Sequence, residues 1–304
     1  MMIEPFLNHL SVNRKLSPET IKAYRADLTG FGAFLTERGL RINQVTPATI
    51  AEYILSMKQQ DNPRFGRTGL SDVTINRRIT AVRRYYEYLR ANSNQRLKNP
   101  TVVIRHPRPR NDDPKAIDDQ DLDTLLAGID SVRDRTLFAL FVATGLRLSE
   151  MWQLNRDSIS IEIFTDELGR ERRLGTGEVI GKRSKKRRFF FDGPTIDIVA
   201  AYLMTRTDTS PALFISERHK RMSRRAMQER LAYWTKRLGL PHAHPHQLRH
   251  SYATRLANAN IDSMILKDLM GHDDLGTTNR YFHFHDQTLA RGYFSAMEYL
   301  KRND

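Results

Sequence analysis

Apolar side chains recur at helical spacing near the start of the chain. Ser17 and Pro18 suit the N-cap and the first position of a helix. The apolar residues that follow lie on one helical face until Gly39: Ile21, Tyr24, Leu28, Phe31 and Leu35. This spacing predicts a long amphipathic helix with one buried face.

Two further helices and a loop complete this first region. Thr46 and Pro47 repeat the opening pair, and Ser71 precedes a third, longer helical pattern. Between these two helices, residues 59–70 are polar and rich in proline and glycine, which predicts a loop. We therefore expect residues 1–98 to fold as a small helical bundle.

Strands join the helices in the second half of the chain. Asp118 suits the cap of a helix, and residues 132–143 are apolar on most sides, which predicts a buried helix. Runs of β-branched and aromatic residues predict strands at 158–164, near 179–180 and at 187–191. Further helices are predicted at 194–205, 223–238, 246–258, 262–270 and 286–301. The expected fold is therefore mainly α with a small antiparallel β-sheet.

A proline-rich segment separates the two regions. Residues 99–114 contain four prolines, with Arg105, Arg108 and Arg110 between them. Prolines favour extended backbone, so we expect a stiff basic linker between a domain at 1–98 and a domain at 115–304. The arginines suit contact with a phosphate backbone, although the simpler role of such a linker is to keep the two domains apart.

The composition adds a strong positive charge. The formal net charge is +14 and the pI is about 10.1, which favours a polyanion such as nucleic acid as partner. Residues 1–98 contain 16 Lys and Arg against 8 Asp and Glu, so this excess is pronounced in the first domain. We interpret the arginines of its third helix as a DNA-binding face rather than a solvated one: Arg77, Arg78, Arg83 and Arg84.

Cysteine is absent, so thiolate metal sites and disulfides are excluded, and a reducing cytoplasm is the simplest location. The first ten residues, MMIEPFLNHL, show neither a secretory signal nor a membrane span. We expect no membrane partner and, given the charge, association with the nucleoid.

Two arginines and a histidine stand in local sequences that suit phosphate chemistry. Arg147, in ATGLRLSE, follows the turn after the buried helix, and Glu150 is close enough in sequence to orient its guanidinium. His246 and Arg249, in HQLRH, lie three positions apart and share a helix face. A guanidinium fork matches the charge of a phosphate, and histidine moves protons near neutral pH. Each pair taken alone also fits ordinary structural polarity.

His272 and Tyr281 extend the set. His272 follows Gly271 at a predicted helix end, and Tyr281 lies nine residues further on. A tyrosine side chain can form a covalent intermediate. The histidines in HAHPH and HFH invite a metal-binding interpretation, which we reject because no cysteine or carboxylate completes a ligand set at recognised spacing. We expect no metal and no cofactor.

A strongly basic run precedes the last predicted strand. GKRSKKRR has six basic residues in seven, and its position between two strands predicts a basic hairpin tip. The run suits simple attraction to a DNA backbone, with Arg183, Lys185 and Lys186 as candidate contacts. It also suits a lysine that protonates a leaving group.

In this order, ATGLRLSE, VIGK…KKRR, HQLRHSYAT, LMGH and TTNRY resemble the motifs of the tyrosine recombinase or phage integrase family, in the style of its compact Xer-like members. The basic first region resembles the core-binding domain of that family, so the resemblance covers nearly the whole chain. It implies a core-binding bundle and a catalytic domain that form a clamp around DNA.

The resemblance also implies a role for each site residue. Arg147 and Arg249 would hold the scissile phosphate, His246 would assist proton movement at the nucleophile, and His272 would hydrogen-bond the phosphate. Tyr281 would be the nucleophile that forms a 3′-phosphotyrosine, Lys182 would protonate the leaving oxygen, and Glu150 would give support. Arg183 follows Lys182 where many relatives have glycine, and the stretch before Lys182 is long, so Lys185 or Lys186 could be the acid instead.

The function implied is site-specific recombination between two short core sites by four protomers on two DNA duplexes. The final helix would dock on a neighbouring protomer, and a heteromeric recombinase partner stays open, as does the choice between dimer resolution, transposon movement and phage integration. The alternatives are a type IB topoisomerase-like or hairpin-forming resolvase, which shares the chemistry, and a non-catalytic DNA-binding protein.

Overall fold

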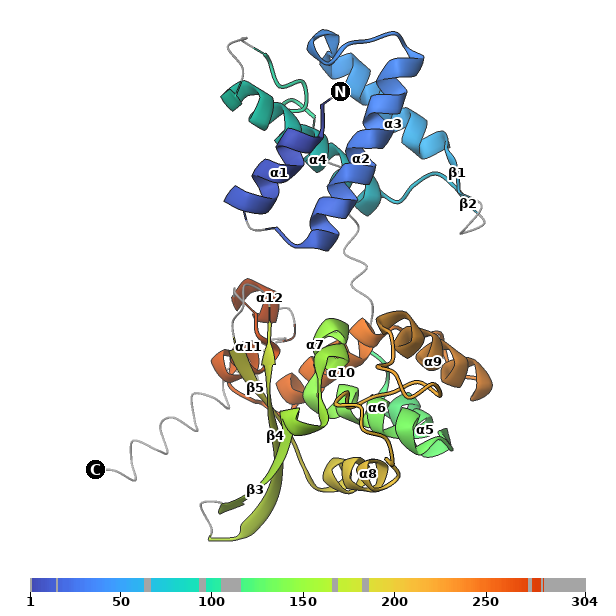
Figure 1. Cartoon of the computed structure of the whole chain (residues 1–304), viewed down its shortest axis with the longest axis vertical. Coiled ribbons are helices and arrows are strands. Elements are labelled where there is room, and N and C mark those ends of the chain that lie inside the picture. Colours follow the sequence, from blue (N-terminus) through green and yellow to red (C-terminus); the bar gives the residue numbers. More distant parts are fainter. Residues whose placement is uncertain are drawn as a thin grey trace, which may run out of the picture. The chain divides into compact units, whose positions relative to one another are not determined.

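The computed structural model describes residues 2–14, 16–62, 67–92, 97–104, 116–165, 169–181, 186–272, 275–279 and 281 (Figure 1). The chain divides into two compact units, Met1–Asp112 and Asp113–Asp304. Mostly helical secondary structure with a small antiparallel sheet confirms the predicted fold class. In this described part of the chain, no helix combines the length and the apolar character that a membrane crossing needs.

The first unit is a helical bundle, as predicted. Its elements are α1 (Glu4–Asn13), α2 (Pro18–Glu37), the 3₁₀ turn η1 (Ile42–Gln44), α3 (Pro47–Gln59) and α4 (Asp72–Asn92). Ser17 and Thr46 cap α2 and α3 by accepting hydrogen bonds from the backbone N–H groups of Thr20 and Thr49. Helix α1, which was not predicted, buries Phe6, Leu7 and Leu10.

Two segments of this unit differ from expectation. The predicted loop at 59–70 contains a two-residue ladder between β1 (Asp61–Asn62) and β2 (Arg67–Thr68). Residues 99–104, expected to be extended, form a turn packed on α4 instead. Arg83 donates to the Thr101 carbonyl at 3.0 Å, and Thr101 donates to the Asn99 side chain at 2.7 Å. These hydrogen bonds stabilise a turn where the proline content had predicted extended backbone. Residues 105–114 of the predicted linker lie outside the described residues.

The second unit contains the remaining elements. They are α5 (Asp119–Gly128), α6 (Val132–Thr144), α7 (Leu148–Gln153), η3 (Arg156–Ser158), β3 (Ile159–Thr165), β4 (Glu171–Ile180), β5 (Lys186–Phe191), α8 (Gly193–Met204), α9 (Arg224–Arg237), α10 (Pro245–Asn258), α11 (Ser263–Met270) and α12 (Leu275–Asn279). The predicted helix at 286–301 lies outside the described residues.

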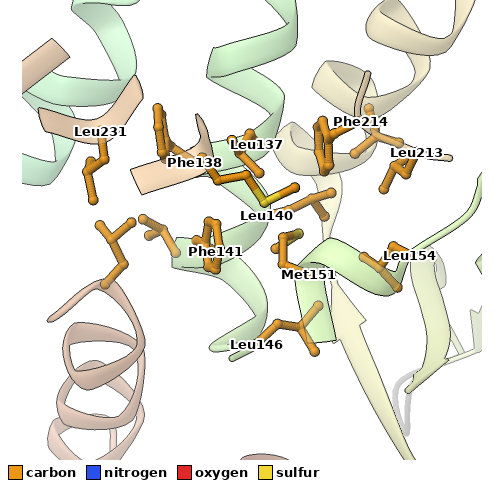
Figure 2. Packing of buried hydrophobic residues seen from close by; sticks show 14 of the residues in the cluster. Leu137, Phe138, Leu140, Phe141, Leu146, Met151, Leu154, Leu213, Phe214 and Leu231 are labelled. Atoms are coloured by element: carbon orange, nitrogen blue, oxygen red, sulfur yellow. The ribbon is translucent and has the colours of Figure 1, made fainter. Parts of the chain in front are cut away.

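Helix α6 is the centre of this unit. It packs on α5, α8, α10 and β5, and Figure 2 shows Leu137, Phe138, Leu140 and Phe141 from this helix among side chains of its neighbours. These four side chains are essentially inaccessible to solvent. A helix that is apolar on nearly all sides therefore occupies the middle of the fold, as its sequence predicts.

The sheet has the order β3–β4–β5, with both pairs antiparallel. Strand β4 is longer than the predicted pair of residues near 179–180 and pairs with β3 from Glu171 to Gly177. Lys186 pairs with Ile180 across β4 and β5, so Lys186 and the two arginines after it belong to a strand. The predicted strand at 187–191 is therefore confirmed and begins one residue earlier, and the prediction of a hairpin tip was wrong for Lys186. Alternation along β5 separates its side chains onto two faces, so Arg187 and Arg188 have different surroundings.

A buried carboxylate stabilises the start of α6. The Asp134 side chain is fully buried and accepts hydrogen bonds from Arg133 at 2.9 Å, Arg230 at 2.6 Å and Trp234 at 2.8 Å. Burial acts to raise the pKa of Asp134, but these donors outweigh it, so the pKa lies below its ordinary value. The ionised form is therefore the one the fold stabilises.

We expect Asp134→Ala to lower the free energy of unfolding by about 3 kcal/mol at pH 7, because Trp234 and two arginines lose a shared acceptor. The folded-state pKa is depressed, so this contribution is present above about pH 4 and is lost as the pH falls through the folded-state value. Urea unfolding at pH 7 and at lower pH measures both effects. Asp130→Ala, which breaks an exposed ion pair with Arg237, is the control and should cost less than about 1 kcal/mol. Equal losses for the two variants would contradict the prediction.

Candidate active site

Arg147 begins α7 and is held by Glu150. Its backbone N–H and its guanidinium donate to the two carboxylate oxygens of Glu150, at 2.9 and 2.7 Å. A second guanidinium nitrogen donates to the Gly271 carbonyl at 2.9 Å. The Arg147 side chain is 34% exposed, so a ligand can reach part of this fixed guanidinium. The expected contact between Glu150 and Arg147 is present in the structure.

Arg249 enters the same place from α10. Its side chain is only 3% exposed and donates to the carbonyls of Gly145, at 2.6 Å, and Met270. Gly145 ends α6 in the left-handed region, at φ +58°, and a Cβ there would lie 2.3 Å from the Tyr252 ring. Glycine is therefore required at the turn that presents this carbonyl. The sequence placed Arg249 on one helix face with His246, but only Arg249 is buried; His246, in the first turn of α10, is exposed.

The C-terminal turn of α11 accepts hydrogen bonds from three arginines. The carbonyls of Leu269, Met270 and Gly271 accept from Arg187, Arg249 and Arg147, respectively. The last carbonyls of a helix have no partner within the helix and bear partial negative charge, so guanidinium donors suit them. Gly271 ends the helix in the left-handed region, at φ +60°. This turn brings the arginines together and leads directly to His272.

His272 and Tyr281 lie on either side of α12. The His272 Nδ1 atom lies 2.9 Å from the Thr278 hydroxyl, and the Tyr281 backbone N–H donates to the Thr278 carbonyl at 3.0 Å. The rings of His272 and Tyr281 are nearly parallel, with centroids 6.4 Å apart. The His250 ring lies 5.0 Å from the Tyr281 ring. The predicted nucleophile therefore stands beside one predicted histidine and beside one that was not predicted.

Positive charge is in excess at this site. Among the described residues, Arg147, Arg187 and Arg249 lie around the carboxylate of Glu150, which is 2.6 Å from Arg187 and 4.0 Å from Arg249. Burial acts to raise the pKa of Glu150, but Arg187 and Arg147 outweigh it and keep the carboxylate ionised. Burial and then the charge of Arg147 lower the pKa of Arg249 to about 9. A bound anion would relieve the repulsion between the guanidiniums.

A depression of about 410 Å³ adjoins this cluster and is lined by Arg147, Arg187 and His272, among others. Among the described residues, no group of three or more His, Cys, Asp or Glu side chains could hold a metal ion. The site therefore presents guanidinium and imidazole groups, a phenol and an open approach, which together suit a phosphate ester.

The candidate acids are only partly within the described residues. Lys182, Arg183 and Lys185 lie outside them. Lys186 lies in β5 with an exposed side chain, and its ammonium group lies 2.8 Å from the Glu178 carboxylate. A hydrogen bond with Glu178 raises the pKa of Lys186, which makes it a weaker proton donor.

The arginines expected to contact DNA in the first unit have different surroundings. Arg77 and Arg78 form ion pairs with the buried carboxylate of Asp27, Arg83 binds the turn at 99–104, and Arg84 is exposed. Of the four, Arg84 is the best placed for an external partner, and Arg83 has a structural use. Arg105, Arg108 and Arg110 lie outside the described residues.

Sequence reasoning missed two residues of the cluster, Arg187 and His250. Arg187 was assigned to the basic run and to the predicted strand at 187–191 but was given no role at the site, and His250 was passed over although it adjoins Arg249. For Arg187 a signal was available, because alternation along a strand places it on the same face as Phe189 and Phe191, which are buried. Its partner on β4, Val179, is buried as well. For His250 no signal in the sequence indicated an approach to Tyr281.

Comparisons with known proteins extend over both units. Residues 115–288 match the model of the phage integrase family, and residues 3–93 match the model described as "Phage integrase, N-terminal SAM-like domain". Tyrosine recombinase XerC of Haemophilus influenzae (strain PittEE) is 33% identical over 307 residues, which cover 98% of this chain and 97% of that protein. XerC of Escherichia coli O139:H28 (strain E24377A / ETEC) is 33% identical over 309 residues, which cover 99% and 97%.

Two solved structures have a similar fold. The XerH site-specific recombinase bound to difH substrate, in a pre-cleavage complex, has a TM-score of 0.70 at 21% identity, over 90% of this chain and 78% of that one. The Tn1549 transposon integrase in complex with transposon right end DNA has a TM-score of 0.72 at 18% identity, over 98% of this chain and 100% of that one.

Proposed function

Since the chain belongs to the phage integrase family and is a tyrosine site-specific recombinase, we propose that it cleaves and rejoins DNA through a 3′-phosphotyrosine at Tyr281. The observation that supports this most directly is the C-terminal turn of α11, at Leu269, Met270 and Gly271. Three arginines, Arg147 and Arg249 among them, donate to its carbonyls, His272 follows it, and the Tyr281 ring lies nearly parallel to the His272 ring.

The proposed step is an in-line displacement at phosphorus. The Tyr281 oxygen forms a bond to phosphorus while the bond to the 5′-oxygen breaks, and a free 5′-hydroxyl is left. Free tyrosine has a pKa of about 10, so its proton must be removed as it attacks, and His246 is the proposed acceptor. The reverse reaction on a new 5′-hydroxyl rejoins the strand, because the tyrosyl ester keeps the phosphate activated.

Arg147 and Arg249 have the proposed role of holding the non-bridging oxygens. Both guanidiniums are fixed by backbone carbonyls before any substrate binds, so little reorganisation is needed when negative charge grows in the transition state. His272 would donate a hydrogen bond to the same phosphate, and Glu150 would keep Arg147 oriented. The excess of positive charge around Glu150 supports this assignment.

Lys182 has the proposed role of general acid toward the 5′-oxygen. Lys185 and Lys186 are the alternatives, and of these Lys186 is already engaged by Glu178. This ion pair counts against Lys186 as the acid. The basic residues Arg77, Arg78, Arg83, Arg84, Arg105, Arg108, Arg110, Arg183, Lys185 and Lys186 remain the proposed DNA contacts, with Arg84 favoured among those described.

We further propose a role for each domain, an assembly on DNA and a cellular role. Residues 1–98, with the turn at 99–104 packed on them, would bind the core site, the rest of the predicted linker up to residue 114 would connect the domains, and residues 115–304 would catalyse. Four protomers would act on two duplexes, alone or with a second recombinase. The likeness to XerC over nearly the full chain favours an Xer-like role in dimer resolution, in the cytoplasm at the nucleoid, over element integration.

Covalent trapping tests the chemistry. The wild-type protein is incubated with fragments of its host or element DNA in the presence of EDTA, denatured, and examined for protein-linked DNA, and the linked peptide is mapped. We expect an adduct at Tyr281 that forms without metal. DNA binding with no adduct, even on nicked substrates that prevent religation, would favour the non-catalytic alternative.

A further inference from the structure

Arg187 is the third guanidinium of the cluster, and the proposed mechanism gives it no role. Its side chain is 8% exposed and extends from β5 toward α7 and α11. One guanidinium nitrogen lies 2.6 Å from the Glu150 carboxylate, and the other lies 2.5 Å from the Leu269 carbonyl. Its guanidinium is therefore bound to the protein at both ends, to Glu150 in α7 and to the C-terminal turn of α11.

Arg187 completes the hydrogen bonding of Glu150. One oxygen of that carboxylate accepts from the Arg147 guanidinium, and the other accepts from the Arg147 backbone N–H and from Arg187. Arg147 and Arg187 together thus fix the orientation of the Glu150 carboxylate. Without Arg187, Glu150 would lose the donor that opposes Arg147, and the Arg147 guanidinium would lose part of its orientation.

Arg187 also supports the turn that leads to His272. A Cβ at Gly271 would lie 2.7 Å from the Arg187 Cδ and 3.0 Å from its Nε, so the stem of Arg187 lies directly on this glycine. The Gly271 carbonyl in turn accepts from Arg147. A single side chain therefore contacts the supports of both Arg147 and His272.

We propose that Arg187 is a positioning residue, which places Arg147 through Glu150 and His272 through the Gly271 turn for contact with the scissile phosphate. This inference rests on the proposed function. Lysine at this position would keep the charge and most of the stem, but it has no planar fork that reaches a carboxylate and a carbonyl in fixed directions.

The test measures single-turnover cleavage by Arg187→Lys on two nicked substrates of the same sequence. One has a normal scissile phosphate, and the other has a neutral methylphosphonate there. On the normal substrate we expect cleavage to slow by about 100-fold, the scale of a misplaced catalytic group. On the methylphosphonate the loss should shrink to within about threefold, because a neutral centre needs the Arg147 guanidinium less.

Arg147→Ala serves as the reference, since it should show the same recovery on the neutral substrate. Arg173→Lys is the matched control, because Arg173 is another strand arginine in an ion pair, with Asp197, and it is 56% exposed. Its cleavage rate should stay within about twofold of wild type, as expected for an exposed pair. DNA affinity and the melting temperature are measured for every variant, and Arg187→Gln provides a second substitution in case the lysine variant does not fold.

The outcomes separate the two proposals. Absence of an adduct with wild-type protein refutes the proposed function itself. With an active wild type, cleavage by the lysine variant within threefold of wild type on the normal substrate overturns the positioning role. Equal losses on both substrates, or failure of both variants to fold, show a purely structural role and overturn it as well.

Discussion

Tyr281→Phe is expected to abolish covalent adducts and strand exchange while leaving DNA affinity within about twofold of wild type. The substitution removes one oxygen from a ring that lies beside His272 and His250, and it leaves the ring packing in place. Among the described residues around it, Tyr252 is also a tyrosine, but it is buried and burial raises its pKa, so we expect the loss to be complete rather than partial. Gel analysis of denatured reactions and a binding titration on the same DNA measure the two properties.

Tyr233→Phe is the matched control for that experiment. Tyr233 is 44% exposed on α9, and its hydroxyl accepts a hydrogen bond from Arg237, so the substitution also removes an engaged phenol. Its adduct yield should equal that of wild type. Residual adduct from Tyr281→Phe, mapped to another tyrosine, would show that the nucleophile has been assigned to the wrong residue.

Arg249→Lys is expected to slow cleavage by about 100- to 1000-fold, the range for loss of one preorganised donor at a developing oxyanion. Arg249 is buried and bonded to two carbonyls from separate elements, Gly145 and Met270. A lysine has its three donors on one nitrogen, so it cannot reach the two carbonyls and a phosphate in the directions that the planar guanidinium does. Single-turnover cleavage on nicked substrates gives the rate, and circular dichroism during heating reports the effect on the fold.

Arg255→Lys provides the comparison on the same helix. Arg255 is 48% exposed and forms an ion pair with Asp119, so the exchange should change the cleavage rate by less than about twofold. A similar slowing in both variants would mean that α10 is sensitive to any substitution. In that case the proposed phosphate contact of Arg249 would lose its support.

Local spacing predicted those parts of the fold and site that depend on neighbours in sequence. Ser17, Thr46 and Asp118 cap helices as expected, because a cap involves only the next few residues. The bond between Arg147 and Glu150 was predicted for the same reason, since three positions on a helix turn place the two groups together.

Contacts between distant segments escaped prediction. Arg187 is 37 positions from Glu150, and Arg249 is 104 positions from Gly145, so no periodic pattern relates them. The family resemblance supplied Arg249 and Tyr281, but it did not indicate that Arg249 is buried or that Arg187 joins the cluster. The turn at 99–104 was missed because proline content predicts extension, whereas Arg83 and Asn99 fold it onto α4.

The C-terminal turn of α11 sets the spacing between the three guanidiniums of the site. Successive Cα atoms across trans peptides are about 3.8 Å apart, and the carbonyls of Leu269, Met270 and Gly271 each meet a different arginine. The spacing of the guanidiniums is therefore set by covalent backbone geometry rather than by the side chains of α11. An exposed position such as Met264 is consequently open to redesign, while the length and path of this short helix are not.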